Sequence, residues 1–376
     1  MTSHQIRGST SSEGDVVFTV RNGAIAQRQA FEEWSRAWPK AVPPTHLGRL
    51  FPGLVDIHCH GGGGHTFCTT DPDEARKAAE FHHRSGSTTV VASLVTASEE
   101  VLQAQIRALR PLADEGVIAG IHLEGPFLAA SRCGAQDPRY LVPPDPSMTR
   151  RLLETGEGTV VMMTLAPELL GADEVVSVLD DAGVTVAFGH TAADYATFRR
   201  ALDAPKPRVV THLGNGMAPM HHRAPGPVGA VLHKIATDGT SSTHIELIAD
   251  GQHVADQFVA MLAAVGGEVV LVSDAMAASG MPDGPYRLGE LDVVVQDGVA
   301  RLANGSLAGS TSALADIARR SPMSLGALAR YVGSGPAEAL GLADIGELLP
   351  GSHADFVVLD EDRGVRQVMR RGEWLS

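Results

Sequence analysis

Residues 184–213 read VTVAFGHTAADYATFRRALDAPKPRVVTHL, and this stretch contains one complete unit of strand, helix and strand. The apolar runs Val184–Phe188 and Arg208–His212 resemble buried strands, and Ala192–Leu202 between them has helical periodicity. Strands that alternate with helices in this way are typical of parallel βα units. The stretch therefore predicts a parallel sheet that helices cover.

The same alternation extends over residues 54–273, where we predict eight strands. They are Leu54–His58, Thr88–Val95, Val117–Leu123, Val160–Leu165, Val184–Phe188, Arg208–His212, His244–Ile248 and Val269–Ser273. Eight such units are what a (β/α)₈ TIM-like barrel requires, so we expect an α/β barrel. A doubly wound sheet is the alternative, but no G-x-G-x-x-G fingerprint follows the first strand.

The two ends of the chain do not show this alternation of strands and helices. Val16–Ala26 alternates around the turn signal Asn22-Gly23, and Leu291–Leu302 and Phe356–Leu359 are further short strand-like segments. We expect these pieces to form a small β-sandwich domain built from both termini. The predicted division is 1–50 and 341–376 for this domain and 51–340 for the barrel.

Composition narrows the classes of partner. The 376 residues include 44 acidic and 30 basic side chains, a net charge of −14, which disfavours nucleic acid and anionic membranes as partners. The longest apolar stretches, such as Phe258–Gly267, are shorter than the roughly 18 residues that span a bilayer. Met1–Asp15 is polar and unlike a secretory signal, and three cysteines cannot form a disulfide framework, so we expect a cytoplasmic protein.

Polar side chains with metal-binding or proton-transfer chemistry follow the predicted strands, at the rim where barrel enzymes place their active sites. They are His58 and His60, Glu124, His190, His212, His253 and Asp274. Each histidine alone is more often a structural residue than a ligand. Such residues in register after six of the eight predicted strands, the last of them Asp274, predict a metal centre.

Nitrogen and oxygen ligands of this kind suit zinc, iron, cobalt or manganese. A metal at such a rim lowers the pKa of bound water and polarises a carbonyl oxygen, which predicts a hydrolase. The reaction also needs a group that accepts the water proton and returns it to the leaving amine, and Asp274 is the candidate. The alternative role for Asp274 is a helix N-cap or a plain metal ligand.

Seven short motifs carry a resemblance to a known family. They are PGLVDIHCH (52–60), HLEGPF (122–127), GHT (189–191), THLGNGM (211–217), IADGQHV (248–254), VSDA (272–275) and LAGS (307–310). With these motifs the chain resembles the amidohydrolase superfamily over nearly its whole length. Within that superfamily it is similar to the family of deacetylases that act on 6-phosphorylated N-acetyl amino sugars.

The resemblance implies a cytoplasmic homodimer that removes acetate from N-acetyl-D-glucosamine 6-phosphate. It implies that Glu124, His190 and His212 hold the main divalent metal, zinc before iron, cobalt or manganese, and that Asp274 is the general base and then acid. Because His58 and His60 are both present, a second ion bridged by Glu124 is a further expectation.

The resemblance also implies substrate contacts. It puts Asn215, Gly216, Arg223 and His253 near the substrate, with Arg223 reaching into the neighbouring subunit's site, and Leu307, Ala308 and Gly309 over the acetyl group. Some relatives carry a histidine where this chain has Gly134–Asp137, so we expect Ala135 and Gln136 to contact the substrate there. We hypothesise that Cys133 is a lid residue; the alternative is a small loop residue without a role.

Two other functions stay open at this point. The first is an amidohydrolase for another cyclic or linear amide, such as a dihydroorotase-like or amino-acid deacylase reaction. Many such relatives use a carboxylated lysine on the fourth strand, and Val160–Leu165 contains no lysine. The second is a non-catalytic assembly protein on the same scaffold, which the full set of ligands disfavours.

Overall fold

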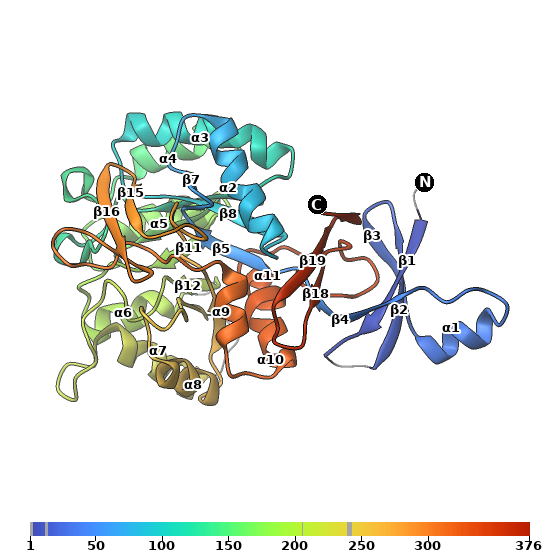
Figure 1. Ribbon diagram of the computed structural model, residues 1–376. Helices are drawn as coiled ribbons and strands as arrows, with labels where there is room; N and C mark the ends of the chain where they lie inside the picture. The colour runs from blue at the N-terminus through green and yellow to red at the C-terminus, as the bar shows by residue number, and fades with distance from the viewer. Residues whose placement is uncertain (1–2, 12–13, 205, 239–242) are drawn as a thin grey trace.

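A computed structural model describes residues 3–11, 14–204, 206–238 and 243–376. Eight parallel strands pair with one another in chain order and form the barrel on the left of Figure 1. They are β5 (Val55–Cys59), β8 (Thr89–Leu94), β9 (Gly120–Glu124), β10 (Val160–Leu165), β11 (Thr185–Phe188), β12 (Arg208–Val210), β13 (Thr243–Leu247) and β14 (Glu268–Leu271). The Asp274 N–H donates to the His58 carbonyl at 2.9 Å and nearly closes the ring between β14 and β5. The predicted α/β barrel is confirmed.

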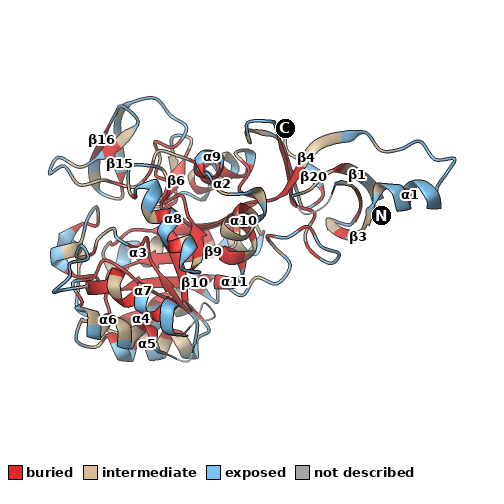
Figure 2. Cartoon of the chain, turned by 90° about the horizontal axis from the view of Figure 1, so that it is seen from below, coloured by how far each residue is buried: buried red, intermediate tan, exposed pale blue. Residues whose placement is uncertain are grey.

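Helices cover the outside of the barrel, with their exposed faces turned to solvent in Figure 2. They are α2 (Pro72–Arg84), α3 (Glu99–Asp114), α4 (Pro146–Gly156), α5 (Ala172–Asp181), α6 (Tyr195–Leu202), α7 (Gly226–Asp238), α8 (Asp256–Ala264), α9 (Leu314–Arg320), α10 (Leu325–Ala329) and α11 (Gly335–Ala339). Helix α3 begins where its sequence provides a cap, because the Ser98 hydroxyl accepts the Val101 N–H. Within the described ranges, no helix combines the length and the apolar character needed to cross a membrane.

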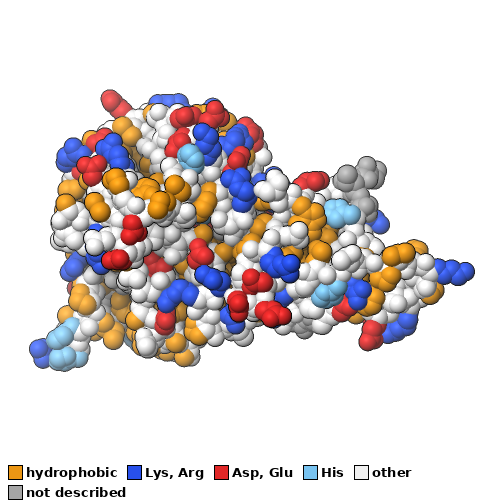
Figure 3. Space-filling model, viewed as in Figure 1, with side chains coloured by type: hydrophobic (Ala, Val, Ile, Leu, Met, Phe, Trp, Pro, Cys, Tyr) orange, Lys and Arg blue, Asp and Glu red, His pale blue; other side chains and the backbone are white. Residues whose placement is uncertain are grey.

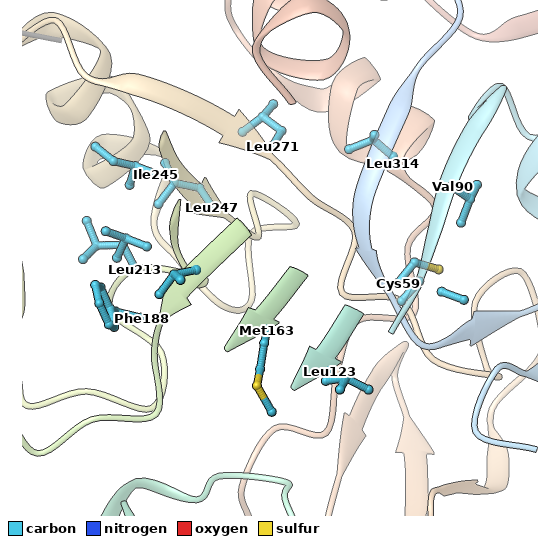
Figure 4. Packing of buried hydrophobic residues seen from close by; sticks show 14 of the residues in the cluster. Cys59, Val90, Leu123, Met163, Phe188, Leu213, Ile245, Leu247, Leu271 and Leu314 are labelled. Carbon is cyan, nitrogen blue, oxygen red and sulfur yellow. The ribbon is translucent and has the colours of Figure 1, made fainter. Parts of the chain in front are cut away.

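The core has two layers because side chains alternate across each strand. Outward-facing residues such as Met163, Ile245 and Leu247 pack against the helices, as Figure 4 shows for neighbouring strands. Inward-facing residues such as Ile57 and Ile248 fill the lower part of the barrel. The lower part of the barrel is therefore apolar.

A second sheet combines the two ends of the chain, on the right of Figure 1. Its seven strands are β1 (Ser3–Ser9), β2 (Asp15–Arg21), β3 (Ala24–Ala30), β4 (His46–Pro52), β18 (Phe356–Leu359), β19 (Val365–Arg370) and β20 (Glu373–Trp374), and α1 (Phe31–Ala37) follows β3. Asn22 and Gly23 form the predicted hairpin turn with φ values of 51° and 80°. Phe18 and Phe356 pack edge to face with centroids 5.0 Å apart and join the two ends.

The expectation that Leu291–Leu302 belongs to this terminal sheet is wrong. The segment forms a separate three-stranded sheet of β15 (Gly284–Leu288), β16 (Leu291–Gln296) and β17 (Val299–Arg301). Val293 and Val295 pack with Met276 and Ala308, close to the barrel mouth. Alternation along a strand shows that one face is buried but not which sheet it joins. The domain limits at 50/51 and 340/341 stay a prediction, and β4 runs across the first.

Five short elements complete the described chain. Gly61–Gly62 (β6) pairs with His65–Thr66 (β7) in a small hairpin after the first barrel strand. The long connection after β9 holds two 3₁₀ turns, η1 (Ala130–Arg132) and η2 (Pro138–Tyr140). A π-helical turn over Arg330–Ser334 separates α10 from α11.

Candidate active site

The residues singled out from the sequence lie together at the carboxyl ends of the barrel strands. His58 is in β5, Glu124 ends β9, and His190, His212 and Asp274 follow β11, β12 and β14. The last three have left-handed backbone, with φ values of 46°, 28° and 46°. Residues other than glycine rarely adopt this conformation, and it is concentrated at functional sites. Here the chain turns sharply where each strand ends.

Four imidazoles converge on the Glu124 carboxylate. The Nε2 atoms of His190 and His212 each lie 3.0 Å from Glu124 Oε1, and these two nitrogens are 3.1 Å apart. His60 Nε2 lies 3.1 Å from Glu124 Oε2, and His58 Nε2 lies 3.6 Å from Oε1. Two groups that share Glu124 could therefore each hold an ion: His58 with His60, and His190 with His212.

The hydrogen bonds on the far side of three of the four rings test whether these residues fit a metal. His60 Nδ1 lies 3.1 Å from the Ser93 carbonyl, His190 Nδ1 lies 2.8 Å from the Arg132 carbonyl, and His58 Nδ1 lies 3.0 Å from a Glu246 oxygen. Carbonyl and carboxylate oxygens only accept hydrogen bonds, so each Nδ1 carries a hydrogen. Each Nε2 is then the atom that can offer a lone pair, which is the arrangement of metal-binding histidines. The residues fit a divalent ion.

The charges at the site are strongly coupled. Burial disfavours the Glu124 carboxylate, but nearby His58 and hydrogen bonds from His190 and His212 outweigh it and hold the pKa of Glu124 well below its usual range. Burial opposes charge on His58 and His60 as well, yet the surrounding carboxylates raise the pKa of both rings well above the ordinary value. Without an ion, protons on these rings neutralise the carboxylates, and a divalent cation would compete with those protons.

Asp274 is beside the same group of atoms. Its Oδ1 lies 3.2 Å from His60 Nε2 and 3.6 Å from His58 Nε2. Burial raises the pKa of Asp274, but the positive charges on His58 and His60 outweigh burial and lower it. An ionised carboxylate in this position can accept a proton.

These side chains line a cavity of about 260 Å³ at the barrel mouth. Its lining contains His60, Glu124, Gly134, Ala135, Gln136, His190, His212, Asn215, Gly216, His253, Asp274, Leu288, Ser306, Leu307 and Gly309. Most of the residues singled out from the sequence are thus brought together. The cavity has the size and the polar groups of a small-molecule site.

Four of the residues singled out are not in that lining. His58 is fully buried behind His60 and Glu124. Ala308 is buried against the three-stranded sheet. Arg223 is exposed on the loop between β12 and α7, where its guanidinium lies 2.7 Å from His222 Nε2. Cys133 is half-buried at the end of η1, and its role as a lid residue stays a prediction.

Gly216 is required for a local steric reason as well as for its predicted contact with substrate. Its φ is +59°, and a Cβ added there would lie 2.9 Å from His190 Nδ1 and 3.3 Å from the Arg132 carbonyl. A side chain at this position would press on the hydrogen bond that orients His190.

His253 is held by a second carboxylate. Its Nδ1 lies 2.8 Å from Asp250 Oδ2, which also accepts the Ser310 hydroxyl at 3.0 Å. Burial raises the pKa of Asp250, but the hydrogen bond and charge of His253 outweigh it and lower that pKa to about 2. Burial disfavours charge on His253 too, and Asp250 overcomes it and raises the His253 pKa. The raised pKa favours the protonated form of the His253 ring, which lies at the cavity, while Asp250 behind it balances that charge.

The sequence did not predict two side chains that form hydrogen bonds to the candidate metal ligands. Gln136 is at the cavity as expected, but its Nε2 donates to Glu124 Oε2 at 2.5 Å and its Oε1 accepts the Thr96 N–H at 2.7 Å. Glu246 contacts His58 from inside the barrel. The available signal for Glu246 was a carboxylate within the apolar strand His244–Ile248.

Comparison with known proteins gives consistent relatives. The Amidohydrolase family matches residues 49–375. The N-acetylgalactosamine-6-phosphate deacetylase of Escherichia coli O157:H7 is 34% identical over 355 residues, 90% of each chain. The N-acetylglucosamine-6-phosphate deacetylase of Bacillus subtilis (strain 168) is 34% identical over 342 residues, 86% of this chain and 83% of the relative.

Solved structures agree with these relatives. The N-acetyl-D-glucosamine-6-phosphate deacetylase of Mycobacterium smegmatis has a TM-score of 0.91 at 38% identity, covering 99% of this chain and 100% of that one. A variant of that enzyme in complex with N-acetyl-D-glucosamine 6-phosphate has a TM-score of 0.90 at 39% identity, covering 100% and 99%.

Proposed function

This chain belongs to the amidohydrolase family, and on that premise we propose that it removes acetate from N-acetyl-D-glucosamine 6-phosphate to give D-glucosamine 6-phosphate. The observation that carries the proposal is the convergence of four imidazole Nε2 atoms on Glu124, beside Asp274, in a cavity at the strand ends. Relatives that bear this activity in their names match most of the chain.

The metal ligands in this proposal are His58, His60, Glu124, His190 and His212. A divalent ion, when bound, supplies Lewis acidity and lowers the pKa of the water that it binds. Zinc is the proposed ion because a mixed imidazole and carboxylate set suits it, with iron, cobalt and manganese as alternatives. Glu124 Oε1 lies beside His190 and His212 and Oε2 lies beside His60, which supports two ions per chain.

Asp274 is the proposed general base and acid. Its ionised carboxylate accepts a proton at Oδ1 from the attacking water, and the hydroxyl group adds to the acetyl carbon. Asp274 then returns the proton to the amide nitrogen as the carbon–nitrogen bond breaks, so acetate and the free amine leave.

The substrate contacts in this proposal come from the cavity lining. Leu307 and Gly309 lie at the cavity on the segment after β17, and we assign that segment, with Ala308, to the acetyl group. Asn215 and Gly216 are assigned to the sugar phosphate, and His253 is assigned to the substrate without a particular group of it. Ala135 and Gln136 are assigned to the sugar ring.

Arg223 supports a proposal about the assembly. The loop that carries it is exposed from residue 219 to 224, and it belongs to the protruding connection between β12 and α7 in Figure 1. In Figure 3, a projection at the lower left has histidine and a basic side chain at its tip. We propose a homodimer in the cytoplasm in which Arg223 reaches the phosphate in the neighbouring subunit's cavity.

The alternative functions are less well supported. Strand β10 offers no lysine for the carboxylated ligand of dihydroorotase-like enzymes, and Glu124 is positioned between both histidine pairs instead. A non-catalytic assembly protein would not require an ionised Asp274 beside four converging imidazoles.

The test is acetate release from a panel of sugars by protein loaded with a defined metal. We expect turnover of N-acetylglucosamine 6-phosphate and far weaker turnover of N-acetylglucosamine. N-acetylgalactosamine 6-phosphate belongs in the panel because one relative is named for it. Equal rates with the phosphorylated and unphosphorylated sugars would contradict the proposed recognition of phosphate.

A further inference from the structure

Glu246 is a buried carboxylate that the proposed reaction does not use. It lies in β13 and faces the inside of the barrel, while its neighbours Ile245 and Leu247 face the helices. Its side chain is 0% exposed. A buried carboxylate is costly unless it is paired, so its partners indicate why it is there.

The partners of Glu246 belong to both groups of candidate metal ligands. Glu246 Oε2 accepts a hydrogen bond from His58 Nδ1 at 3.0 Å. The same oxygen accepts the backbone N–H of His212 at 3.2 Å. Among the described residues, Glu246 Oε1 has no hydrogen-bond partner. Oε2 alone therefore links the two ligand groups from beneath.

The contact with His58 fixes which ring nitrogen faces the cavity. Because the carboxylate only accepts, Nδ1 must donate, and Nε2 is turned toward Glu124 Oε1 and Asp274 Oδ1, each at 3.6 Å. The rings of His60 and His190 are oriented in the same way by backbone carbonyls. Of these three rings, only His58 depends on a side chain.

We propose that Glu246 is a positioning residue that orients His58 as a ligand and thereby determines whether the His58–His60–Glu124 group binds an ion. The inference rests on the proposed metal-dependent function. It adds a separate claim, that one carboxylate outside the ligand set controls the second ion and leaves the His190–His212–Glu124 group able to bind the first.

The experiment measures zinc stoichiometry and affinity by equilibrium dialysis of metal-stripped full-length protein followed by elemental analysis. The variants are Glu246→Met, which has similar volume and no acceptor at that position, and Glu246→Gln, which keeps an acceptor but loses the charge. Glu268→Gln is the matched control, because Glu268 lies in the adjacent strand β14 and pairs with Arg330 away from the site. Melting temperatures of the metal-free proteins report on folding.

We expect two zinc ions per chain in the wild type and in Glu268→Gln. Glu246→Met should keep one tightly bound ion and lose the other. In Glu246→Gln the second ion should bind about 10–100-fold more weakly, the usual effect of removing a partner that orients a ligand. A purely structural role for Glu246 would lower the melting temperature without removing one ion selectively.

The inference would be overturned if both variants bound two ions with unchanged affinity, or if the wild type bound only one ion. If Glu246→Met does not fold, unchanged zinc affinity in Glu246→Gln would overturn it. Acetate release by the same wild-type preparation separates this inference from the proposed function. An active wild type with unaltered variants defeats only the role of Glu246, whereas a zinc-loaded wild type without activity defeats the proposed function.

Discussion

Asp274 is positioned by its own backbone. Its N–H donates to the His58 carbonyl at 2.9 Å and its carbonyl accepts the Ser310 N–H at 2.8 Å. These bonds hold the left-handed conformation that directs the carboxylate to His60. The backbone geometry at Asp274 is therefore independent of the charge on its side chain.

This independence predicts the behaviour of Asp274→Asn at the residue scale. The amide has the same shape but cannot accept the proton from water, so turnover should fall about 10²–10⁴-fold, the usual contribution of a general base. Metal content should stay close to that of the wild type. Acetate release and elemental analysis on one preparation check both statements, and near-normal turnover would remove Asp274 from its proposed role.

Gly216 gives a second prediction at the residue scale. Gly216→Ala should displace the His190 ring and weaken metal binding, because the added Cβ would lie 2.9 Å from His190 Nδ1. Gly214→Ala is the matched control, since Gly214 has a φ of +93° but its nearest neighbour to an added Cβ is 3.9 Å away. Zinc affinity measured on both variants checks this expectation, and equal affinities would contradict it.

The sequence predicted which residue types line the mouth of the barrel. It predicted less well which groups form hydrogen bonds to them. Histidines and carboxylates directly after apolar strands are visible in the sequence, because a strand end fixes where a side chain lies in a barrel. The groups that orient His60 and His190 are the carbonyls of Ser93 and Arg132. Every residue has a carbonyl, so side-chain chemistry gives no sign of them.

Individual elements were predicted to within a few residues. The eight predicted strands all overlap observed ones, and α6 ends at Leu202 as predicted. Strand β12 ends at Val210, earlier than the predicted His212, because the backbone at His212 has left the extended conformation with a φ of 28°. The end of a strand is thus hardest to predict where the chain turns to place a residue in the candidate active site.

Helix α2 carries a testable consequence of burial. His83 is 5% exposed, and burial first, with the nearby charge of Arg370 second, lowers the pKa of His83 to about 2. In the unfolded chain the pKa of histidine is about 6.5. As pH falls from 6.5 toward 2, the unfolded state binds a proton that the folded state does not, so His83 reduces stability over this range.

His83→Gln should therefore flatten the pH dependence of unfolding. Glutamine can still donate to the Val117 carbonyl, which His83 contacts, but does not titrate. The slope of unfolding free energy against pH between 4 and 6 should decrease by about 1.4 kcal/mol per pH unit. Urea unfolding of metal-free wild type and variant measures the two slopes, and identical slopes would show that His83 is not buried as a neutral ring.

On the scale of the whole molecule, contacts between residues far apart in the chain determine which strands share a sheet, and the sequence pattern does not predict these contacts. The terminal sheet depends on pairing between β4 and β18, which are about 300 residues apart in the chain. Short strand-like segments in the sequence identified several of its strands. The same kind of signal led to the wrong assignment of Leu291–Leu302, because which surface covers a strand is decided by distant residues such as Met276.

The distribution of surface charge agrees with the expectation from composition that nucleic acid and anionic membranes are not partners. Basic and acidic side chains are interspersed on the face in Figure 3. A single anionic group can nevertheless bind locally, because one guanidinium can contact phosphate oxygens through two hydrogen bonds. The net charge of −14 is therefore compatible with a phosphorylated small molecule.

The proposed position of Arg223 predicts complementation between subunits. Arg223→Ala and Asp274→Asn should each be poorly active alone. After unfolding and refolding together, mixed dimers should contain one complete site, which restores about a quarter of wild-type activity if subunits pair at random. Light scattering confirms that dimers formed; mixed dimers without restored activity would mean that Arg223 does not act across the interface.

The central claim is that this chain is a metal-dependent deacetylase of a phosphorylated amino sugar. The most direct measurement is acetate release from N-acetylglucosamine 6-phosphate by wild-type protein before chelation, after complete removal of metal, and after zinc is added back. We expect activity in the first state, its loss in the second, and its recovery as zinc fills the site. Acetate release that persists in fully metal-free protein, or none at any zinc content, would contradict it.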